Sequence, residues 1–314
     1  MSAASDSATA AGVERSALIA GVAAFTFWGV IPIYWKWMSA VPASQILAHR
    51  FVWTTAFLIF LLTWQQRWLE VRSTMRSPRA MFYCVASGSA IAVNWLVFIW
   101  AVNVGRVLET SLGYFMTPLV NVLFGAIFLR ERLTRLQFAS VLLATCAVLN
   151  LTFGYGRFPW IAVALAVSFG LYGLLRKVSA TAAIPGLFLE TILLTPLAVG
   201  FLAVVQLQGK LFFGAPDWTG SLLLFTTGVV TSLPLVWFGF AARHLRLTTL
   251  GFLQYIAPSC TFFLGVFLYD EPFTRAHLIT FGLIWIALAM FTAETVRRWR
   301  SMRANAEAIP PIAE

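Results

Sequence analysis

The segment RVLETSLGYFMTPLVNVLFGAIFLRERLTR, residues 106–135, occurs a second time without gaps as RLTTLGFLQYIAPSCTFFLGVFLYDEPFTR, residues 246–275. The copies are offset by 140 positions and share six residues: Arg106/Arg246, Pro118/Pro258, Gly125/Gly265, Glu131/Glu271, Thr134/Thr274 and Arg135/Arg275. In a chain that is 60% hydrophobic, apolar residues match easily by chance, whereas Pro, Glu and Arg are scarce. The matches therefore indicate an internal duplication.

The composition around the repeat is that of a membrane protein. The chain has 314 residues, a mean hydropathy of +0.83, only 11% charged residues and 13 Trp. A helix that crosses a bilayer needs roughly 20 mostly apolar residues. Ten such windows predict an all-α integral membrane fold with ten transmembrane helices: 18–38, 44–64, 80–102, 107–129, 133–151, 159–176, 185–206, 219–241, 248–268 and 276–295.

The repeat divides these windows into two halves of five. We expect the first half to cover residues 17–152 and the second 153–296. Residues 1–16 are small and polar, so they are predicted to form a disordered cytoplasmic tail. Residues 297–314 are predicted to form a second cytoplasmic tail.

The positive charges set the orientation. If the N-terminus lies in the cytoplasm, sixteen Lys and Arg fall on the inner side and five on the outer side. The inner group includes Arg176 and Lys177. This asymmetry follows the positive-inside rule. The net charge of +10 therefore reports topology and contact with anionic lipid, not binding of nucleic acid.

The two copies of the repeat face opposite ways. Five helices separate equivalent points, and an odd number of crossings inverts the second copy. The loop at 130–135, RERLTR, then lies on the inner face, while its counterpart at 270–275, DEPFTR, lies on the outer face and has lost two of three positive charges. Inverted repeats allow a central site to be exposed to each side of the membrane in turn.

Four segments carry a family resemblance: HRFVW (49–53), NWLVFIWAVN (94–103), LETSLGYFMTPLVNVLFGAIFL (108–129) and LRLTTLGFLQYIAPS (245–259). They resemble the RarD-type proteins of the EamA group, in the drug/metabolite transporter superfamily, over about residues 18–295. The resemblance implies a bacterial inner-membrane protein with two five-helix halves that exports small molecules. Thr117 departs from the Asn, and Asp270 from the Gly, that relatives often have.

Three charged residues lie within or near the ends of apolar windows, where a charge is costly. Arg50 is a candidate anchor for an anionic group of the substrate, and we expect it to pair with Glu109 at similar depth. Glu190 and Glu109 are candidate coupling residues, because burial favours the protonated carboxyl group. Structural ion pairs, contacts with lipid headgroups and a carboxylate at a helix start remain alternatives.

Neutral polar and aromatic residues complete the candidate substrate site. Tyr114 and Gln254 are repeat equivalents, four residues before Pro118 and Pro258, and we expect them to flank a central cavity. Hydrogen bonds between helices, and aromatic residues at the lipid surface, are the alternatives. The candidates for substrate binding in addition to Arg50 are Trp28, Asn94, Tyr114, Thr117, Asn121, Gln254 and Tyr255, and Trp95 and Trp100 are further candidate cavity walls.

These features favour a secondary transporter over other classes. A channel or a lipid scramblase on the same scaffold is the alternative. A membrane enzyme is disfavoured, since His49, His244 and His277 lie on separate segments without acidic partners at metal-ligand spacing. No metal, cofactor or disulfide is predicted. The expected partners are a small-molecule substrate and the bilayer, and the sequence decides neither the substrate nor between monomer and homodimer.

Overall fold

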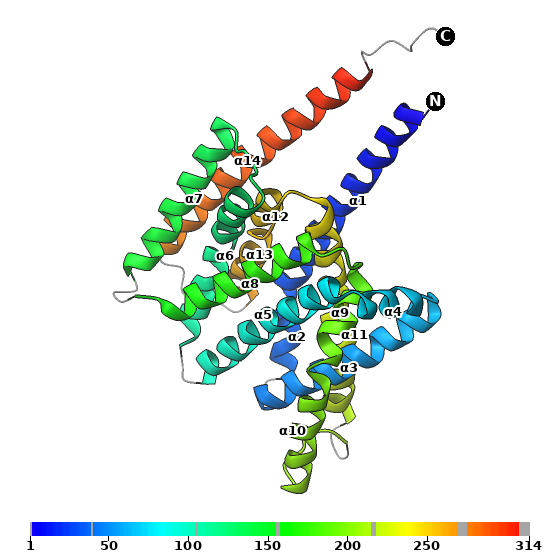
Figure 1. The fold of residues 1–314 in the computed structure, drawn as a ribbon. Helices are drawn as coiled ribbons and strands as arrows, with labels where there is room; N and C mark the ends of the chain where they lie inside the picture. The colour runs from blue at the N-terminus through cyan, green and yellow to red at the C-terminus, as the bar shows by residue number, and fades with distance from the viewer. Residues whose placement is uncertain are drawn as a thin grey trace.

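The computed structural model describes residues 2–38, 40–103, 106–154, 158–214, 218–268 and 275–307, and the regular structure in these ranges is helical (Figure 1). The helices are α1 (Ser2–Val30), α2 (Pro32–Trp37), α3 (Ala43–Trp64), α4 (Trp68–Arg76), α5 (Pro78–Asn103), α6 (Val107–Phe128), α7 (Arg135–Gly154), α8 (Trp160–Val178), α9 (Ala183–Ile192), α10 (Thr195–Leu207), α11 (Trp218–His244), α12 (Leu247–Leu253), α13 (Ile256–Leu268) and α14 (Arg275–Glu307).

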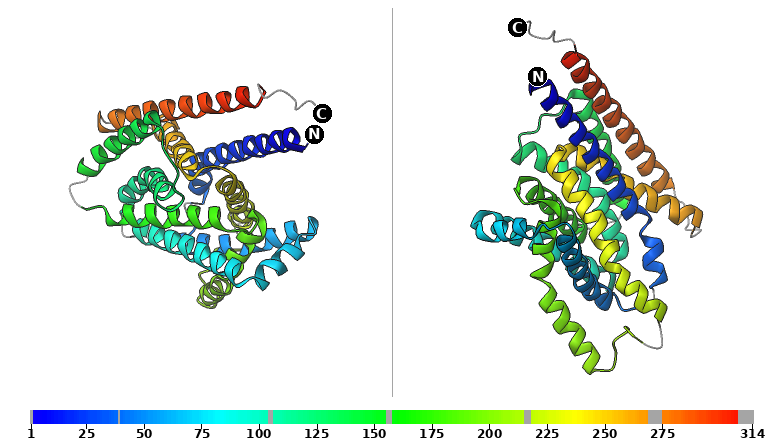
Figure 2. Two further views of the ribbon diagram at one scale, coloured as in Figure 1. Left: turned by 45° about the horizontal axis from the view of Figure 1, so that its top comes forward. Right: turned by 90° about the vertical axis from the view of Figure 1, so that its right-hand side faces the viewer.

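The helices have the length and composition of membrane spans. Within the described ranges, six helical segments are long and apolar enough to cross a bilayer, and a seventh is added if α9 and α10 form one bent span. Two shorter apolar helices lie at 112–128 and 135–150. The chain is therefore a multi-pass membrane protein. The start of α1 and the end of α14 lie at the same end of the molecule (Figure 2).

Three of the ten predicted windows are broken. A turn separates α1 from α2 immediately before Pro32, and α9 and α10 meet at a bend of 44° beside Pro196. Gln254 and Tyr255 separate α12 from α13, shortly before Pro258. Proline cannot donate the main-chain hydrogen bond that continues a helix, and it is tolerated in a first turn. Hydropathy cannot detect such breaks, because the residues on both sides are apolar.

The two tails differ from the prediction. Helix α1 begins at Ser2, so residues 2–16 are helical, and α14 continues through residues 297–307. Both tails contain several Ala, which has the highest helix propensity. Each tail also extends a helix that already exists, which avoids the cost of nucleation. Residues 2–16 and 297–307 are thus helical, and the cytoplasmic position of both tails stays a prediction.

The first helix of each half packs against the other half. Helix α1 contacts α11 and α13, while α8 contacts α5 and α6. Helix α3 packs on α11 and α5 on α9, and the last helices, α7 and α14, lie side by side at one edge (Figure 1). The largest buried cluster includes Phe25, Tyr172, Phe238 and Leu250, where α1, α8, α11 and α12 meet. The halves are interleaved and do not form separate bundles.

Glycine allows the closest of these approaches. A Cβ at Gly228 in α11 would overlap the main-chain carbonyl of Trp53 in α3, and a Cβ at Gly113 in α6 would lie 3.2 Å from the carbonyl oxygen of Ala162 in α8. Lipid tails are as apolar as leucine, so helix association in a bilayer depends on close packing and hydrogen bonds. Glycine at positions such as these therefore lets helices of the two halves approach closely.

Candidate functional site

Arg50 lies inside α3 and is held by residues from both halves. Its Nε donates a hydrogen bond to Thr231 Oγ1 of α11 at 3.1 Å. The guanidinium carbon lies 4.5 Å from the ring centre of Trp95 in α5 and 5.2 Å from that of Trp35 in α2. Aromatic faces attract a cation at these distances. Arg50 is thus fixed in position without a carboxylate partner among the described side chains.

Two phenol groups complete the surroundings of Arg50. The hydroxyls of Tyr34 and Tyr114 lie within electrostatic range of the guanidinium. Tyr34 donates a hydrogen bond to the carbonyl oxygen of Leu223 at 2.5 Å and is fixed by it. Half of the Tyr114 surface is exposed. We name Arg50, Trp35, Trp95, Tyr34, Tyr114 and Thr231 together the Arg50 site.

The terminal nitrogens of Arg50 are its free donors. In the described part of the chain, neither Nη atom has a hydrogen-bond acceptor, and neither is fully enclosed. A guanidinium presents a planar pair of N–H donors that matches a carboxylate or a phosphate. The Arg50 site is therefore suited to bind an anionic group next to an aromatic or apolar body.

A second polar contact joins the halves deeper in the fold. Asn121 Nδ2 of α6 donates to Gln254 Oε1, at the break between α12 and α13, over 2.7 Å. The Oδ1 atom of Asn121 and the hydroxyl of Tyr255 are buried and have no partner among the described residues. Tyr114 and Gln254 are repeat equivalents, yet Tyr114 is half exposed beside Arg50 whereas Gln254 is buried against Asn121.

The remaining neutral candidates have partners within the helix bundle. Asn94 Nδ2 donates to the carbonyl oxygen of Leu165 at 2.9 Å and to Ser168 Oγ at 3.0 Å, joining α5 to α8. The hydroxyl of Thr117 donates to the carbonyl oxygen of Gly113 in its own helix. Trp28 packs edge-on against Phe25 and Phe169. The structure places these three residues in helix contacts, and their roles in binding remain predictions.

Glu190 forms a buried ion pair that the sequence did not predict. Its Oε1 lies 3.3 Å from Arg176 Nη1, and the side chains of Arg176 and Glu190 are 2% and 1% exposed. Ser87 Oγ donates to Oε1 at 2.6 Å and the Tyr172 hydroxyl to Oε2 at 3.4 Å. Gly186 makes room, because a Cβ there would overlap the guanidinium of Arg176.

The side chain of Arg176 is buried, which the count of inner-face charges does not show. It was counted with the loop charges of the inner face, but it is the largest fully buried side chain of the described residues. Arg176 precedes the end of α8 by two residues, and its side chain turns into the bundle to meet Glu190 and the carbonyl oxygen of Ala183. A count of charges uses only the position of a residue along the chain, so it cannot detect that the Arg176 side chain points into the bundle.

The expected pair of Arg50 with Glu109 remains a prediction. The side chain of Glu109 lies outside the described residues, although its backbone belongs to α6. No group of three or more metal-ligating side chains occurs among the residues that the structure describes.

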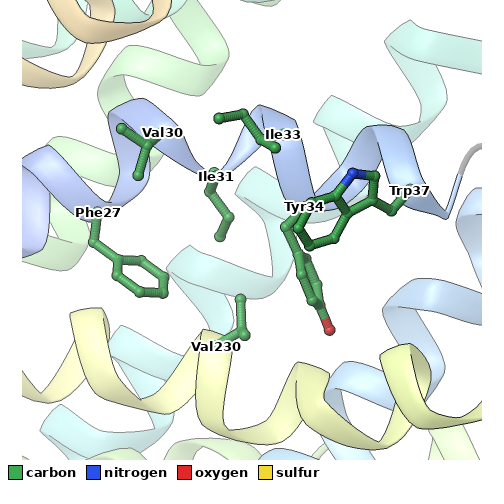
Figure 3. A pocket seen from close by; sticks show the side chains of 7 residues that line it. All are labelled: Phe27, Val30, Ile31, Ile33, Tyr34, Trp37 and Val230. Atoms are coloured by element: carbon green, nitrogen blue, oxygen red, sulfur yellow. The ribbon is translucent and has the colours of Figure 1, made fainter.

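A separate apolar groove lies between α1, α2 and α11. Figure 3 shows its lining, Phe27, Val30, Ile31, Ile33, Tyr34, Trp37 and Val230, around a volume of about 250 Å³. Trp37 is 67% exposed at its edge. The groove has no charged lining residue, so it does not provide the anion contact that Arg50 provides. Tyr34 borders both the groove and the Arg50 site.

The fold and the enclosed polar residues define a multi-pass helical membrane protein with a polar site between its helices. The model of the EamA-like transporter family matches residues 15–153. Protein RarD of Salmonella typhi is 42% identical over 90% of this chain and 96% of that protein. Uncharacterized transporter YojE of Bacillus subtilis (strain 168) is 42% identical over 93% and 98%. The chain therefore belongs to the EamA-like transporter family, as a RarD-type member.

A solved crystal structure has the same fold. It superposes with a TM-score of 0.67 at 22% identity and covers 90% of this chain and 98% of that chain. At this identity the likeness concerns the fold alone. Named relatives are transporters, which supports a membrane transporter and points away from an enzyme.

Proposed function

We propose that this protein is a secondary transporter that exports a small organic molecule across the bacterial inner membrane by alternating access. In this proposal the Arg50 site binds an anionic group of the substrate. The observation that carries it is the position of Arg50: a cation inside a spanning helix, fixed by Thr231 and two Trp rings, whose two terminal nitrogens have no acceptor among the described residues. Burying a charge in a bilayer is costly, and such residues commonly mark substrate pathways.

The helix contacts support an inverted repeat. If the halves are equivalent, the packing of α6 on α8 corresponds to that of α13 on α1, and α5 on α8 corresponds to α11 on α1. Likewise α3 on α11 corresponds to α5 on α9, while α7 on α14 corresponds to itself. Each of these contacts between the halves thus has its counterpart under exchange of the halves, whereas the contacts of α11 with α8 and α9 within the second half have no such counterpart among the described helix pairs. The exchange of contacts between the halves is the pattern that a pseudo-twofold axis in the membrane plane produces.

The termini fit the proposed topology. An even number of crossings places both ends of the chain on one side, as Figure 2 shows for α1 and α14. The excess of Lys and Arg assigns that side to the cytoplasm. Cysteines placed near residues 10 and 303 should react with an impermeant reagent only in inside-out vesicles.

Glu190 and Glu109 are the coupling candidates of this proposal. Protonation of Glu190 would remove the counter-ion of Arg176, and so could link proton binding to a change in helix packing. The three polar contacts around this carboxylate, from Ser87, Tyr172 and Arg176, equally suit a fixed structural pair, and they favour that role. If a variant of Glu190 keeps its fold but loses proton-coupled transport, the coupling role of Glu190 would be supported instead.

Counterflow in proteoliposomes tests the proposal. Purified protein is first screened by thermal shift against carboxylate-bearing, phosphate-bearing and uncharged metabolites, because a ligand of the folded state raises its stability. A labelled ligand that stabilises the protein should then enter faster when unlabelled ligand is inside. Absence of counterflow under every gradient would favour the channel or scramblase.

Variants of Arg50 test the site itself. Arg50→Gln should lose counterflow and the stabilisation by anionic ligands, since the positive charge and the planar pair of guanidinium donors disappear. Arg50→Lys should retain part of the affinity, as a point charge without the planar pair of donors. Arg79→Gln, at an exposed position, is the control. Normal counterflow by Arg50→Gln would remove Arg50 from substrate binding.

A further inference from the structure

Glu131, one of the six residues repeated between the halves, connects the first half to the second. It lies in the loop between α6 and α7, and its side chain reaches the start of α12. Oε1 accepts a hydrogen bond from the amide of Leu247 at 2.7 Å. Oε2 accepts two more from Thr248, from the amide at 2.9 Å and from Oγ1 at 2.8 Å. The Glu131 carboxylate therefore binds three donors of the other half.

Two further contacts hold the same segment. Lys177 Nζ donates to the carbonyl oxygen of Leu245, and Arg246 Nη2 donates to the carbonyl oxygen of Arg132 at 2.7 Å. Arg246 Nε also lies 3.8 Å from Glu131 Oε2. The main chain at 245–248 is thus fixed on its carbonyl side by α8 and on its amide side by the first half. We name this set of contacts the 131–248 clasp.

The backbone around Glu131 is shaped for this contact. Arg130 has a φ of +53°, which turns the chain after α6, and the amide of Glu131 donates to the carbonyl oxygen of Gly125 at 2.9 Å. A Cβ at Gly125 would lie 2.9 Å from Glu131 Oε2 and 3.3 Å from Thr248 Cγ2. Glycine at 125 therefore leaves the space that the carboxylate fills.

The clasp gives the repeated residues a physical role. Gly125 leaves space for the carboxylate of Glu131. Arg246 directly precedes α12, and the first amides of α12 donate to this carboxylate. The motif at the end of one copy thus binds the start of the other copy. Glu271, the repeat equivalent of Glu131, lies outside the described residues and forms no part of the inference.

We infer that Glu131 is a positioning residue of the transport cycle: the 131–248 clasp closes the face of the molecule where α12 begins, and the Glu131 carboxylate must leave Leu247 and Thr248 before the central site opens there. This inference rests on the proposed function, since it assigns the clasp to one closed state of an alternating-access transporter. Hydrogen bonds to a charged group are stronger than those between neutral groups, so the clasp stabilises the closed state. The contacts are non-covalent, so they can break when the molecule opens.

Accessibility of a reporter cysteine tests the inference without a substrate. Leu250 is fully buried one turn into α12, next to the clasp. Leu250→Cys is made in a background in which Cys84, Cys146 and Cys260 are replaced by Ala. A membrane-impermeant maleimide is then applied to right-side-out and inside-out vesicles. In the closed state, position 250 should react slowly from both sides.

Removal of the clasp should raise the labelling from one side only. Glu131→Ala should increase the rate about tenfold in one vesicle orientation, which corresponds to about 1.4 kcal/mol in the equilibrium between closed and open states. Glu131→Gln keeps the volume and one acceptor and should give a smaller increase. Thr248→Val removes only the hydroxyl donor and should give the smallest. Glu70→Gln, which removes the charge of a carboxylate in the first turn of α4 paired with Arg67, is the control and should leave the rate unchanged.

Two results would overturn the inference: labelling of Glu131→Ala and Glu131→Gln at the unaltered rate, or an equal increase from both sides, which would indicate general loosening of the fold. The transport assignment fails separately. Absence of counterflow in the unaltered protein as well as in the variants, with the one-sided labelling response intact, would reject the transporter and leave the clasp as a closing contact of another membrane protein.

Discussion

Replacement of Glu190 by Gln should destabilise the protein strongly. The substitution keeps the size of the side chain and removes the charge that faces Arg176 at 3.3 Å. Because both side chains are buried, the guanidinium of Arg176 would be left without its counter-ion. Breaking a buried pair from one side costs about 3–5 kcal/mol. At an unfolding entropy of about 2.1 cal/mol/K per residue, that loss lowers Tm by about 5–8 °C in a chain of this length.

The assay is thermal unfolding in detergent, followed by intrinsic Trp fluorescence. The double variant Arg176→Met/Glu190→Met should recover most of the loss, because two apolar side chains leave no unpaired charge. Glu70→Gln is the control: it breaks an exposed pair with Arg67 and should cost less than about 1 kcal/mol. If Tm of Glu190→Gln stays within about 1 °C of the unaltered protein, the Arg176–Glu190 pair is not a structural element and the argument from burial is wrong.

Two further predictions use matched positions. Gly228→Ala should destabilise the protein by about 1–3 kcal/mol through overpacking, since a Cβ would overlap the carbonyl of Trp53. Gly200 has open space around it, so Gly200→Ala should be neutral or stabilising by up to about 1 kcal/mol. Equal Tm changes for the two variants would contradict the packing argument. The hydrogen bond from Arg67 lowers the pKa of Glu70 below 4.5, so the pair contributes stability above that pH and loses it as the pH falls through the lowered value. The Tm difference between the unaltered protein and Glu70→Gln, measured from pH 7 to pH 3, should shrink toward zero, and a constant difference would refute the assignment.

The apolar windows predicted an all-α membrane protein correctly, whereas the orientation that the charges indicate stays a prediction. Each of the ten apolar windows lies mostly on helical backbone, because a helix that spans a bilayer requires an apolar run of defined length, which hydropathy detects. The turn before Pro32, the bend beside Pro196 and the break before Pro258 are indicated by the position of proline within each window, not by hydropathy. Helical tails at both ends show that polar composition alone does not exclude helix when a spanning helix lies next to the segment.

Sequence reasoning named Arg50, Trp95 and Tyr114 as candidates, but not the other residues around the Arg50 guanidinium. Trp35 and Thr231 come from elements that are distant in sequence, and no periodicity predicts that they meet at one guanidinium. Glu190 offered a usable signal: a carboxylate in an apolar window needs a cation or a proton. A search for that cation among residues near helix ends would have found Arg176. Glu131 was marked by repetition, but its role appears only when the loop is seen beside α12.

The packing of α1 against the second half has a consequence for biosynthesis. Its main partners, α11 and α13, begin at residues 218 and 256, so about 190 residues separate the end of α1 at Val30 from the start of α11. At about 5–20 residues per second, the ribosome needs roughly 10–40 s to supply the first partner. During that interval α1 lies in the bilayer with lipid on the face that later contacts α11. The first half therefore cannot mature on its own, and truncation after residue 152 should yield a chain that membrane quality control removes.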